Sequence, residues 1–325
     1  MHKYHTTDFS ELQFLVTGGA GFIGSNIVAY LLKHNAKKVR VLDNLSNGYM
    51  ANLEPFLHLQ NFEFVKGDIR DLETCKQAVL GMDYVSHQAA LGSVPRSIDN
   101  PILSNAVNVT GFLNMLVALK ESKTVKRMVY AASSSTYGDS ANLPKVETII
   151  GAPLSPYAVT KYVNELYADV FGKTYNTDVI GLRYFNVFGP KQSANGAYAA
   201  VIPLFMEAVS NNKPATINGD GEQTRDFTYV DNAVQANVKA FFALDNAKNE
   251  VFNIACGERI SINELWSSIN DSANKKIKAI HGPNRAGDVK DSLADISKAK
   301  ALLGYTPDYS VKTGLAVTWD YFSKQ

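Results

Sequence analysis

The glycine-rich stretch at residues 18–24, Gly-Gly-Ala-Gly-Phe-Ile-Gly, constrains the fold more than any other part of the chain. An apolar run at 13–17 precedes it and predicts a buried strand, and a helical pattern follows it. Glycines between a strand and a helix permit a tight turn and leave the helix N-terminus open to a phosphate. The dinucleotide fingerprint G-x-G-x-x-G is met by Gly19, Gly21 and Gly24, and the spacing G-x-x-G-x-x-G by Gly18, Gly21 and Gly24.

An acidic residue follows the next predicted strand, at residues 38–42. Asp43 lies 19 residues beyond Gly24 and is followed by Asn44. A carboxylate at this distance from the glycines is suited to binding the adenine ribose hydroxyls of a dinucleotide. Because it would repel a 2′-phosphate, the residue favours NAD over NADP. The alternative interpretation is an aspartate in a strand-end turn.

Strands and helices alternate along the first part of the chain. We predict strands at 62–66, 84–88, 127–132 and 178–184, and helices at 70–80, 105–120 and 155–175. This alternation is typical of an α/β fold with a doubly wound parallel sheet (Rossmann), which binds ligands beyond the carboxyl ends of its strands. Five polar residues fall at such ends: Asp43, Asp68, Gln88, Ser133 and Asn186.

The regular alternation fades after about residue 188. Helices are predicted at 199–210, 231–244 and 261–272, and short strands at 215–217, 227–230 and 251–254. We expect residues 1–188 to form the NAD-binding Rossmann domain and 189–325 a smaller C-terminal α/β substrate-binding domain. The two are expected to be interleaved, with the first domain taking back some later segments.

Composition narrows the class of partner. The net charge of +1 over 325 residues gives no argument for nucleic acid or a membrane surface as a partner. Two distant cysteines, Cys75 and Cys256, suggest neither a disulfide framework nor a metal site, and the six histidines lack ligand spacing. The first eleven residues are polar, and no stretch is expected to be long and apolar enough to span a bilayer. A cytoplasmic protein without a metal is expected.

A tyrosine and a lysine stand four residues apart in the sequence Ser-Pro-Tyr-Ala-Val-Thr-Lys at 155–161. In a helix, Tyr157 and Lys161 would lie on one face, one turn apart. A nearby ammonium favours the phenolate, so Lys161 is expected to lower the pKa of Tyr157 from about 10 toward working pH. The pair is a candidate acid/base catalyst. The alternative is an amphipathic helix that carries both residues by chance.

Taken together, these motifs resemble the extended short-chain dehydrogenase/reductase family. The resemblance covers nearly the whole chain and rests on Tyr157 with Lys161 and on segments 17–24, 43–45, 67–71, 87–90, 133–138 and 183–190. It implies that Tyr157 is the catalytic acid or base and that Lys161 anchors the nicotinamide ribose. It also implies that Ser133 hydrogen-bonds the reacting hydroxyl; the alternative for Ser133 is a strand-end turn serine.

The same resemblance implies the residues that bind NAD. Asn108 matches a family asparagine near the site, with helix packing as its alternative role. The full expected cofactor set is Gly18, Gly21, Phe22, Ile23, Gly24, Asp43, Asn44, Ser46, Gly48, Asp68, Ile69, Gln88, Ala89, Ala90, Asn108, Tyr157, Lys161, Tyr184 and Val187.

The residues after Ser133 indicate which reaction in the family to expect. Dehydratases of nucleotide sugars carry Asp-Glu there, whereas this chain has Ser134, Ser135 and Thr136 and so lacks a carboxylate for elimination. UDP-sugar 4-epimerases match that pattern. Segments 89–97, 131–139, 195–203 and 218–221 are similar to bacterial UDP-N-acetylhexosamine 4-epimerases. By the resemblance, Ser292 takes a position where epimerases restricted to UDP-glucose and UDP-galactose carry a bulky tyrosine, so its small side chain would leave room for a 2-acetamido group. The alternative for Ser292 is an exposed turn serine.

The expected substrate site follows from the same resemblance. Asn186, Arg225 and Arg285 would hold the diphosphate, and Asp288 the uridine ribose. A surface salt bridge is the alternative for either arginine alone. The full set is Ser93, Ser133, Ser134, Ser135, Tyr157, Asn186, Ala200, Val201, Asn218, Arg225, Arg285, Asp288 and Ser292.

The resemblance therefore implies a 4-epimerase with tightly bound NAD. It would interconvert UDP-N-acetylglucosamine and UDP-N-acetylgalactosamine through a transient 4-keto sugar. Whether UDP-glucose and UDP-galactose are a second substrate pair is left open. A 4-epimerase of UDP-N-acetylglucosaminuronic acid is the near alternative, and Arg96 does not decide between them. A non-catalytic NAD-binding scaffold or sensor is an alternative of another class, against which Ser133, Tyr157 and Lys161 argue. A homodimer built on helices 105–120 and 155–175 is expected.

Overall fold

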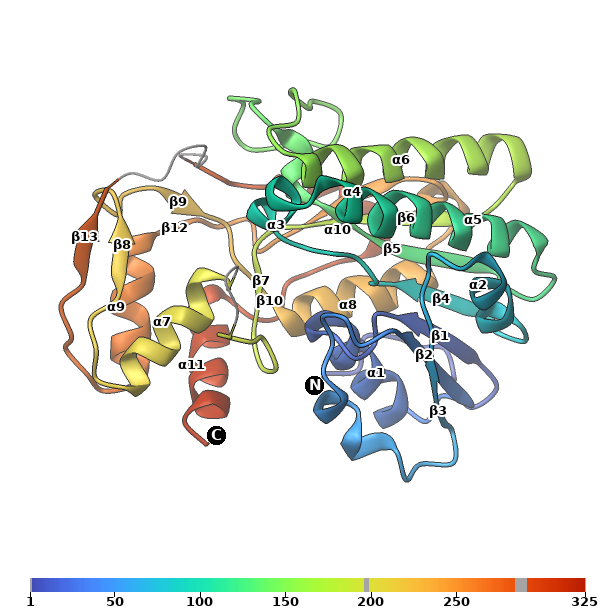
Figure 1. The fold of residues 1–325 in the computed structure, drawn as a ribbon, viewed down its shortest axis with the longest axis horizontal. Coiled ribbons are helices and arrows are strands. Elements are labelled where there is room, and N and C mark those ends of the chain that lie inside the picture. The colour runs from blue at the N-terminus through green and yellow to red at the C-terminus, as the bar shows by residue number, and fades with distance from the viewer. Residues whose placement is uncertain (1, 196–198, 284–290, 325) are drawn as a thin grey trace.

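A seven-stranded parallel sheet forms the centre of the computed structural model, which describes residues 2–195, 199–283 and 291–324 (Figure 1). Its strand order is β11-β6-β5-β4-β1-β2-β3. Successive strands are added on one side of β1 up to β3 and on its other side from β4 onward, so the strand order reverses between β1 and β4. The doubly wound α/β fold predicted from the sequence is thus confirmed. The strands are β1 (Gln13–Thr17), β2 (Lys38–Asp43), β3 (Phe62–Lys66), β4 (Tyr84–His87), β5 (Arg127–Ser133), β6 (Val179–Tyr184) and β11 (Val251–Ile254).

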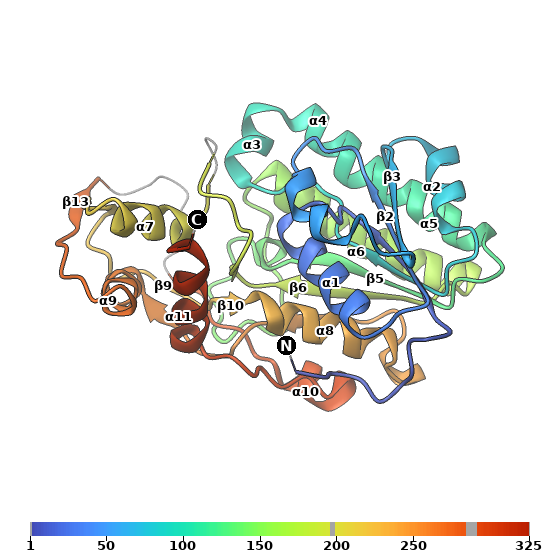
Figure 2. The ribbon, with the colours of Figure 1, turned by 90° about the horizontal axis from the view of Figure 1, so that it is seen from below.

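Helices cover both faces of this sheet (Figures 1 and 2). Helices α2 (Leu72–Val79), α5 (Gly111–Glu121) and α6 (Pro156–Tyr175) pack on one face, and α1 (Phe22–Lys33), α8 (Val230–Phe241) and α10 (Ser297–Leu303) on the other. Because side chains alternate along a strand, Phe14 and Leu15 of β1 enter different cores, and both are fully buried.

One long helical stretch passes over the sheet beside α6. It comprises α4 (Pro101–Asn105), a π-helical segment (Ala106–Thr110) and α5. Contrary to the sequence expectation, this stretch of 21 residues is long and apolar enough to cross a membrane by length and composition alone. In this fold 44% of the apolar window is buried, because its apolar side chains pack against α2 and the sheet. A helix in the core of a folded protein also meets this criterion of length and composition.

The later part of the chain builds a smaller α/β layer beside the sheet (Figure 1). Helices α7 (Val201–Ser210), α9 (Ile262–Ser272) and α11 (Val311–Phe322) enclose a core that includes Phe205 and Trp266, whose rings meet edge to face. Three short strand pairs complete it: β7 (Val187–Phe188) with β10 (Thr228–Tyr229), β8 (Thr216–Asn218) with β13 (Ile280–Gly282), and β9 (Thr224–Arg225) with β12 (Ile260–Ser261).

Most predicted elements are present, with ends shifted by a few residues. Helices α3 (Val94–Asp99), α10 and α11 were not predicted, because they are short or follow polar loops. The later half also returns to the large sheet: β11 pairs with β6, and α8 packs against α1. The domain boundary near residue 188 stays a prediction.

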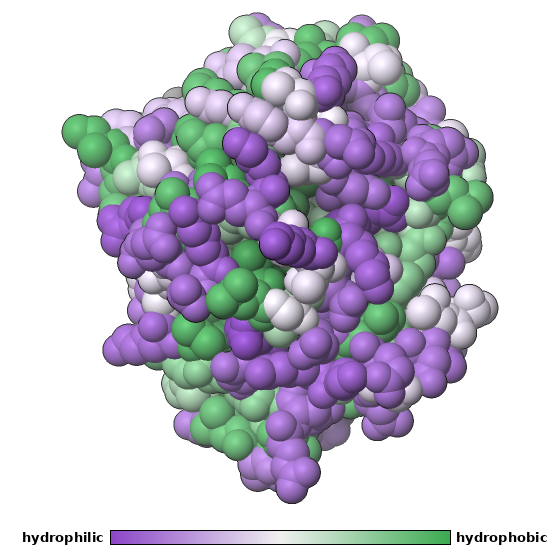
Figure 3. All heavy atoms as spheres, turned by 90° about the vertical axis from the view of Figure 1, so that its right-hand side faces the viewer, coloured by the Kyte–Doolittle hydropathy of each residue, from purple (hydrophilic) through white to green (hydrophobic). Residues whose placement is uncertain are grey.

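The end of the molecule opposite the expected ligand edge is covered mostly by hydrophilic side chains, with small hydrophobic groups between them (Figure 3). The carboxyl ends of the strands point the other way, toward the smaller layer, where the candidate site lies (Figure 1).

Candidate active site

The glycine turn after β1 leaves space that a side chain would fill. Gly18 has a φ of +68°, and a Cβ placed on it would approach the Ala89 backbone nitrogen to 2.7 Å. Gly21 caps α1 without a side-chain hydrogen bond, and the first turn of α1 carries no acidic residue. The amide groups of this helix end are therefore available to an anion such as a pyrophosphate.

Asp43 stands at the end of β2, beside the glycine turn. The residue is 8% exposed, and its carboxylate accepts hydrogen bonds from the backbone amides of Ala20 (3.0 Å) and Leu45 (2.8 Å). Burial raises the pKa of Asp43, and the two backbone donors oppose that rise. Gly48 packs close by, since a Cβ on it would lie 3.1 Å from an Asp43 oxygen. The carboxylate thus has a fixed position with lone pairs left for a ribose.

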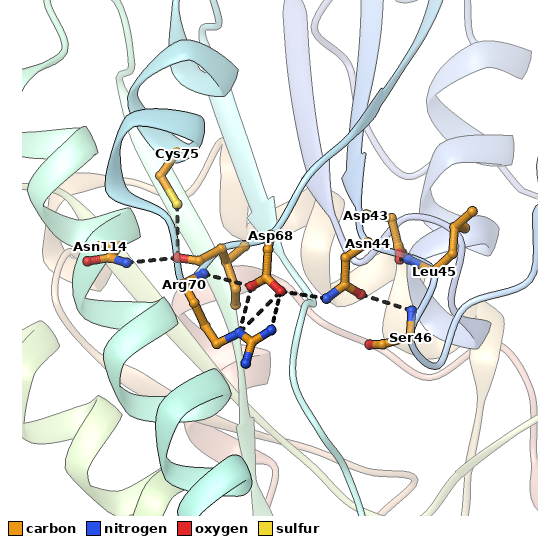
Figure 4. Close-up of polar contacts among 9 residues, drawn as sticks. Asp43, Asn44, Leu45, Ser46, Asp68, Arg70, Cys75 and Asn114 are labelled. Carbon is orange, nitrogen blue, oxygen red and sulfur yellow. Dashed lines mark hydrogen bonds and ion pairs between the residues drawn. The ribbon is translucent and has the colours of Figure 1, made fainter.

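A second acidic residue joins the loops after β2 and β3 (Figure 4). Asp68 accepts hydrogen bonds from the Asn44 amide (2.9 Å) and from the Arg70 guanidinium (2.7 Å), and mainly the latter lowers its pKa to about 2. The Ile69 carbonyl accepts a hydrogen bond from the Asn114 amide at 2.9 Å. These contacts fix the floor of the cleft.

These residues share one cleft at the switch point between β1 and β4. Its lining is Gly18, Gly21, Leu42, Asp43, Asn44, Ser46, Asn47, Gly48, Gly67, Asp68, Ile69, Gln88, Ala89, Ala90, Leu91 and Val107. A turn that excludes side chains, an uncapped helix end and a fixed carboxylate are the features that a dinucleotide requires. The residues present therefore fit NAD.

The candidate catalytic residues lie at the next strand end. Helix α6 begins after Ser155, whose hydroxyl accepts the Ala158 amide at 3.1 Å. Lys161, one turn after Tyr157, donates from Nζ to the Ala131 carbonyl at 2.7 Å, and its Nζ lies 5.9 Å from the centre of the Tyr157 ring. Tyr157 also shares a hydrogen bond with Ser133, the last residue of β5.

Burial dominates the electrostatics of this group. It raises the pKa of Tyr157, and the hydrogen bond with Ser133 partly opposes the rise. It lowers the pKa of Lys161 to about 8, and the Glu165 carboxylate partly opposes that shift. The expectation that Lys161 lowers the pKa of Tyr157 was therefore wrong for the protein alone. The Lys161 ammonium donates to the Ala131 carbonyl instead, and the loss of water around the phenol dominates the pKa of Tyr157.

Asn108 connects three parts of the site. Its side chain accepts the Leu91 amide (2.8 Å) and donates to the Leu91 carbonyl (3.1 Å) and the Thr160 hydroxyl (3.1 Å). Thr160 in turn donates to the Tyr157 carbonyl. Both polar atoms of Asn108 thus contact protein groups, so in this structure it ties the loop after β4 to helix α6.

Two cavities open next to the candidate catalytic residues. The first, of about 590 Å³, brings together six predicted substrate residues, namely Ser133, Ser134, Ser135, Asn186, Arg225 and Ser292. The second, of about 520 Å³, contains Ser93, Ala200 and Val201 and shares Asn186 with the first. Asn186 has a φ of +37° and donates to the Asp226 carbonyl at 2.8 Å.

Some predicted site residues are absent from the lining of the cavity in which they were expected. Val187 lines the second cavity rather than the cofactor cleft. The Tyr184 hydroxyl accepts a hydrogen bond from Asn237 Nδ2 (2.7 Å) and donates one to Gln88 Oε1 (3.3 Å). Asn218 is exposed at the end of β8, away from both cavity linings. The side chains of Phe22 and Ile23 pack against apolar clusters, whereas their backbone amides belong to the α1 end beside the glycine turn. Arg285 and Asp288 lie outside the described residues.

Sequence reasoning missed two charged residues beside the first cavity. Lys145 lines it and is 5% exposed. Asp226, fully buried, accepts the backbone amides of Cys256, Gly257 and Ala294, and burial raises its pKa to about 7. A charged residue next to an apolar run was the available signal. Among residues 2–195, 199–283 and 291–324, no group of His, Cys, Asp and Glu is arranged to hold a metal ion.

Comparison with known proteins identifies the family. The model of the "NAD dependent epimerase/dehydratase family" matches residues 14–255. The chain belongs to this family. A putative UDP-glucose 4-epimerase of Methanocaldococcus jannaschii is 38% identical over 309 residues, which cover 94% of this chain and 97% of the relative.

Solved structures of the family superimpose closely on this fold. A UDP-N-acetylglucosamine 4-epimerase from Methanobrevibacter ruminantium M1, in complex with UDP-N-acetylmuramic acid, has a TM-score of 0.91 and 39% identity, with 97% of this chain and 99% of that chain covered. A UDP-glucuronic acid 4-epimerase from Bacillus cereus, in complex with UDP-glucuronic acid and NAD, has a TM-score of 0.88 and 32% identity, with 96% and 99% covered. NAD is thus the cofactor of this family member, and its structural neighbours bind UDP-sugars.

Proposed function

We propose that this protein is a 4-epimerase that interconverts UDP-N-acetylglucosamine and UDP-N-acetylgalactosamine and retains NAD tightly. The observation that carries the proposal is the first cavity, in which Ser133 and the small Ser292 line the same space of about 590 Å³. Ser292 is held there by a hydrogen bond from its amide to the Thr224 carbonyl at 3.1 Å. A small side chain at this place leaves room for a 2-acetamido group.

The chain's own residues divide the work of moving one proton and holding one sugar. Ser133 orients the 4-hydroxyl of the sugar. Tyr157, hydrogen-bonded to Ser133, takes the proton of that 4-hydroxyl and later returns a proton to the same oxygen. Because burial raises the pKa of Tyr157, the phenolate needs additional positive charge. Bound NAD would supply that charge and the hydride chemistry at C4. Lys161, fixed on the Ala131 carbonyl, is placed to orient the nicotinamide ribose.

The residues around the first cavity favour epimerisation over the loss of water that a dehydratase catalyses. The residues directly after Ser133 carry hydroxyls rather than carboxylates. Of the acids that line the cavity, Asp291 accepts the Thr224 hydroxyl at 2.6 Å, and Asp99 also has partners within the protein. A proton exchange through Tyr157 alone is sufficient for epimerisation, which needs no acid for a leaving group.

The diphosphate end of the substrate would be held by Arg225 and Asn186. Both line the first cavity, and a guanidinium fork suits phosphate oxygens. This end has to stay bound while the 4-keto sugar turns to present its other face. Arg285 and Asp288 are retained in the proposed substrate set from the sequence alone.

The test uses purified protein without added NAD. We would incubate it with UDP-N-acetylglucosamine and follow the anomeric signals by proton NMR. Formation of UDP-N-acetylgalactosamine would support epimerisation, the acetamido site and retained cofactor together. Turnover of the 6-carboxylate analogue alone would move the function to uronic acids, and turnover of UDP-glucose alone to unsubstituted sugars. Absence of all three reactions, even with NAD supplied, would contradict the proposal and favour a non-catalytic role.

A further inference from the structure

Lys145 is a buried lysine in the loop between β5 and α6, and no step described so far uses it. Its backbone is anchored on both sides: the amide donates to the Leu293 carbonyl at 2.7 Å, and the carbonyl accepts the Asp295 amide at 2.9 Å. The Asn253 side chain also donates to the Lys145 carbonyl at 2.8 Å. The side chain therefore starts from a fixed backbone position at the cavity.

The ammonium of Lys145 is poorly satisfied by the protein. The residue is 5% exposed, and its Nζ donates to the Ser140 carbonyl. No ion pair joins it to a carboxylate among the described residues. An ammonium has three donors, and a buried charge with one neutral acceptor is costly unless further acceptors reach it. Since Lys145 lines the first cavity, a ligand there can supply them.

The order of residues along the cavity wall indicates which part of a ligand Lys145 would meet. A parallel bridge joins Thr224, next to Arg225, to Asp291, and a second one joins Ala294 to Lys145. Ser292 therefore lies on the strand-like segment between Arg225 and Lys145. If the diphosphate is at Arg225, the sugar carbon attached to it and its 2-substituent come next along this wall.

We propose that the Lys145 ammonium binds the carbonyl oxygen of the 2-acetamido group of the substrate and so determines specificity together with Ser292. The inference rests on the proposed function. An acetamido carbonyl extends beyond the ring and only accepts hydrogen bonds, so it suits a buried cation that needs acceptors. A 2-hydroxyl is shorter, and it leaves the ammonium with the Ser140 carbonyl alone.

The test compares ligands that differ only at carbon 2. Binding of UDP-N-acetylglucosamine and of UDP-glucose to the holoenzyme would be measured by calorimetry in a Tyr157→Phe background, so that the result does not depend on turnover. Lys145→Met removes the charge and keeps the length of the side chain, and Lys145→Arg retains donors. Lys123→Met, an exposed lysine in the loop after α5, is the matched control.

For Lys145→Met we expect the Kd of UDP-N-acetylglucosamine to rise roughly 10- to 100-fold, the range for a hydrogen bond to a charged group, and that of UDP-glucose to change less than about threefold. Lys145→Arg should restore part of the difference, and Lys123→Met should change neither value. Equal weakening of both ligands, with a lowered Tm, would show that Lys145 only supports its loop and would overturn the inference. An unchanged Kd for both ligands would also overturn it.

The outcome separates this inference from the proposed function. If wild-type protein fails to epimerise the acetylated sugar but Lys145→Met still loses its binding selectively, the reaction is wrong and the recognition is right. If wild-type protein turns over the acetylated sugar and Lys145→Met keeps the same preference, the function stands and the role of Lys145 is refuted.

Discussion

Glu165 of α6 and Arg183 of β6 form a bidentate ion pair. Arg183 donates from Nε to Glu165 Oε1 at 2.9 Å and from Nη2 to Glu165 Oε2 at 2.7 Å. The Arg183 side chain is 4% exposed and the Glu165 side chain 7%. Glu165 also accepts the Thr136 hydroxyl at 3.4 Å and lies one turn after Lys161 on α6. The Glu165 carboxylate thus contacts Thr136, in the segment after β5, and Arg183 of β6. It also raises the pKa of Lys161.

We expect Glu165→Gln to move the alkaline limb of the pH profile of kcat/KM to lower pH. The Glu165 carboxylate holds the pKa of Lys161 up against burial, so its removal lowers a pKa that is already about 8. The buried Arg183 also loses its partner, which should cost about 3–5 kcal/mol of unfolding free energy. Asp169→Asn, which breaks an exposed pair with Lys173 on the same helix, is the control. An unshifted alkaline limb would contradict the role of Glu165.

Tyr157→Phe should lower kcat by at least about 100-fold, the usual scale for a positioned acid/base group, while the fold is retained. The change removes one hydroxyl and its hydrogen bond with Ser133. Turnover would be followed by proton NMR and folding by circular dichroism. Tyr162→Phe, on the same helix, provides the matched control. Activity of Tyr157→Phe equal to that of Tyr162→Phe would refute the assignment.

Gly18→Ala should abolish retention of NAD. The residue has a φ of +68°, and the added Cβ would collide with the Ala89 backbone inside the cofactor cleft. Gly81→Ala is a close control, because Gly81 has a φ of +75° but no atom within 4 Å of the new Cβ. Both changes cost about 1 kcal/mol of backbone strain, so only the collision differs. NAD content of the purified variants would be measured by absorbance after denaturation.

The protein should lose stability between pH 6.5 and pH 3 partly through His87. This side chain is 4% exposed, lies 2.8 Å from the Thr17 hydroxyl and has a pKa lowered to about 3 by burial. The unfolded chain therefore binds a proton below pH 6.5 that the folded chain does not bind. The stability from neutral His87 is full above pH 6.5 and declines as the pH falls toward 3.

Urea unfolding at pH 7.5 and pH 5 would measure this effect. The non-titrating variant His87→Asn should lose about 2 kcal/mol less than wild type between the two values. His58→Asn, at an exposed position, should behave as wild type. An equal loss in wild type and His87→Asn would exclude His87 as the source.

The sequence predicted the parts of the fold in which local pattern and ligand chemistry coincide. Gly18 and Asp43 share the cofactor cleft because glycine spacing and a strand-end carboxylate are both local signals. β11 was predicted as a strand, but its place next to β6 depends on a pairing between distant segments, which periodicity does not encode. Helix α3 was missed although Ser93 caps it and Pro95 follows in the first turn.

The candidate site shows the same division. Ser133, Arg225 and Ser292 were expected together from a family resemblance and do line one cavity. The sequence did not predict that the Tyr184 hydroxyl accepts a hydrogen bond from Asn237 of α8, a helix more than fifty residues later. The pKa of Tyr157 was expected to fall, but burial, which the sequence does not report, raises it. The cavity role of Lys145 depends on its bridge to Ala294.

We expect a homodimer that associates through α6 and the α4–α5 stretch, which pack side by side. Val159, Leu166 and Val170 are 48%, 50% and 52% exposed, and their spacing of seven and four residues places them on one face of α6. Ile102 of α4 is 82% exposed. Association of two copies would bury these side chains, which water otherwise surrounds.

Leu166→Glu should convert the dimer to monomers in light scattering after gel filtration, because a charge in an apolar interface is costly to bury. Val317→Glu on α11, where the valine is 42% exposed, alters a comparable apolar residue on another surface and should leave the dimer intact. If wild type is already a monomer at micromolar concentration, or if Leu166→Glu stays dimeric, these helices are not the interface. Since the site is built within one chain, the Leu166→Glu monomer should still retain NAD.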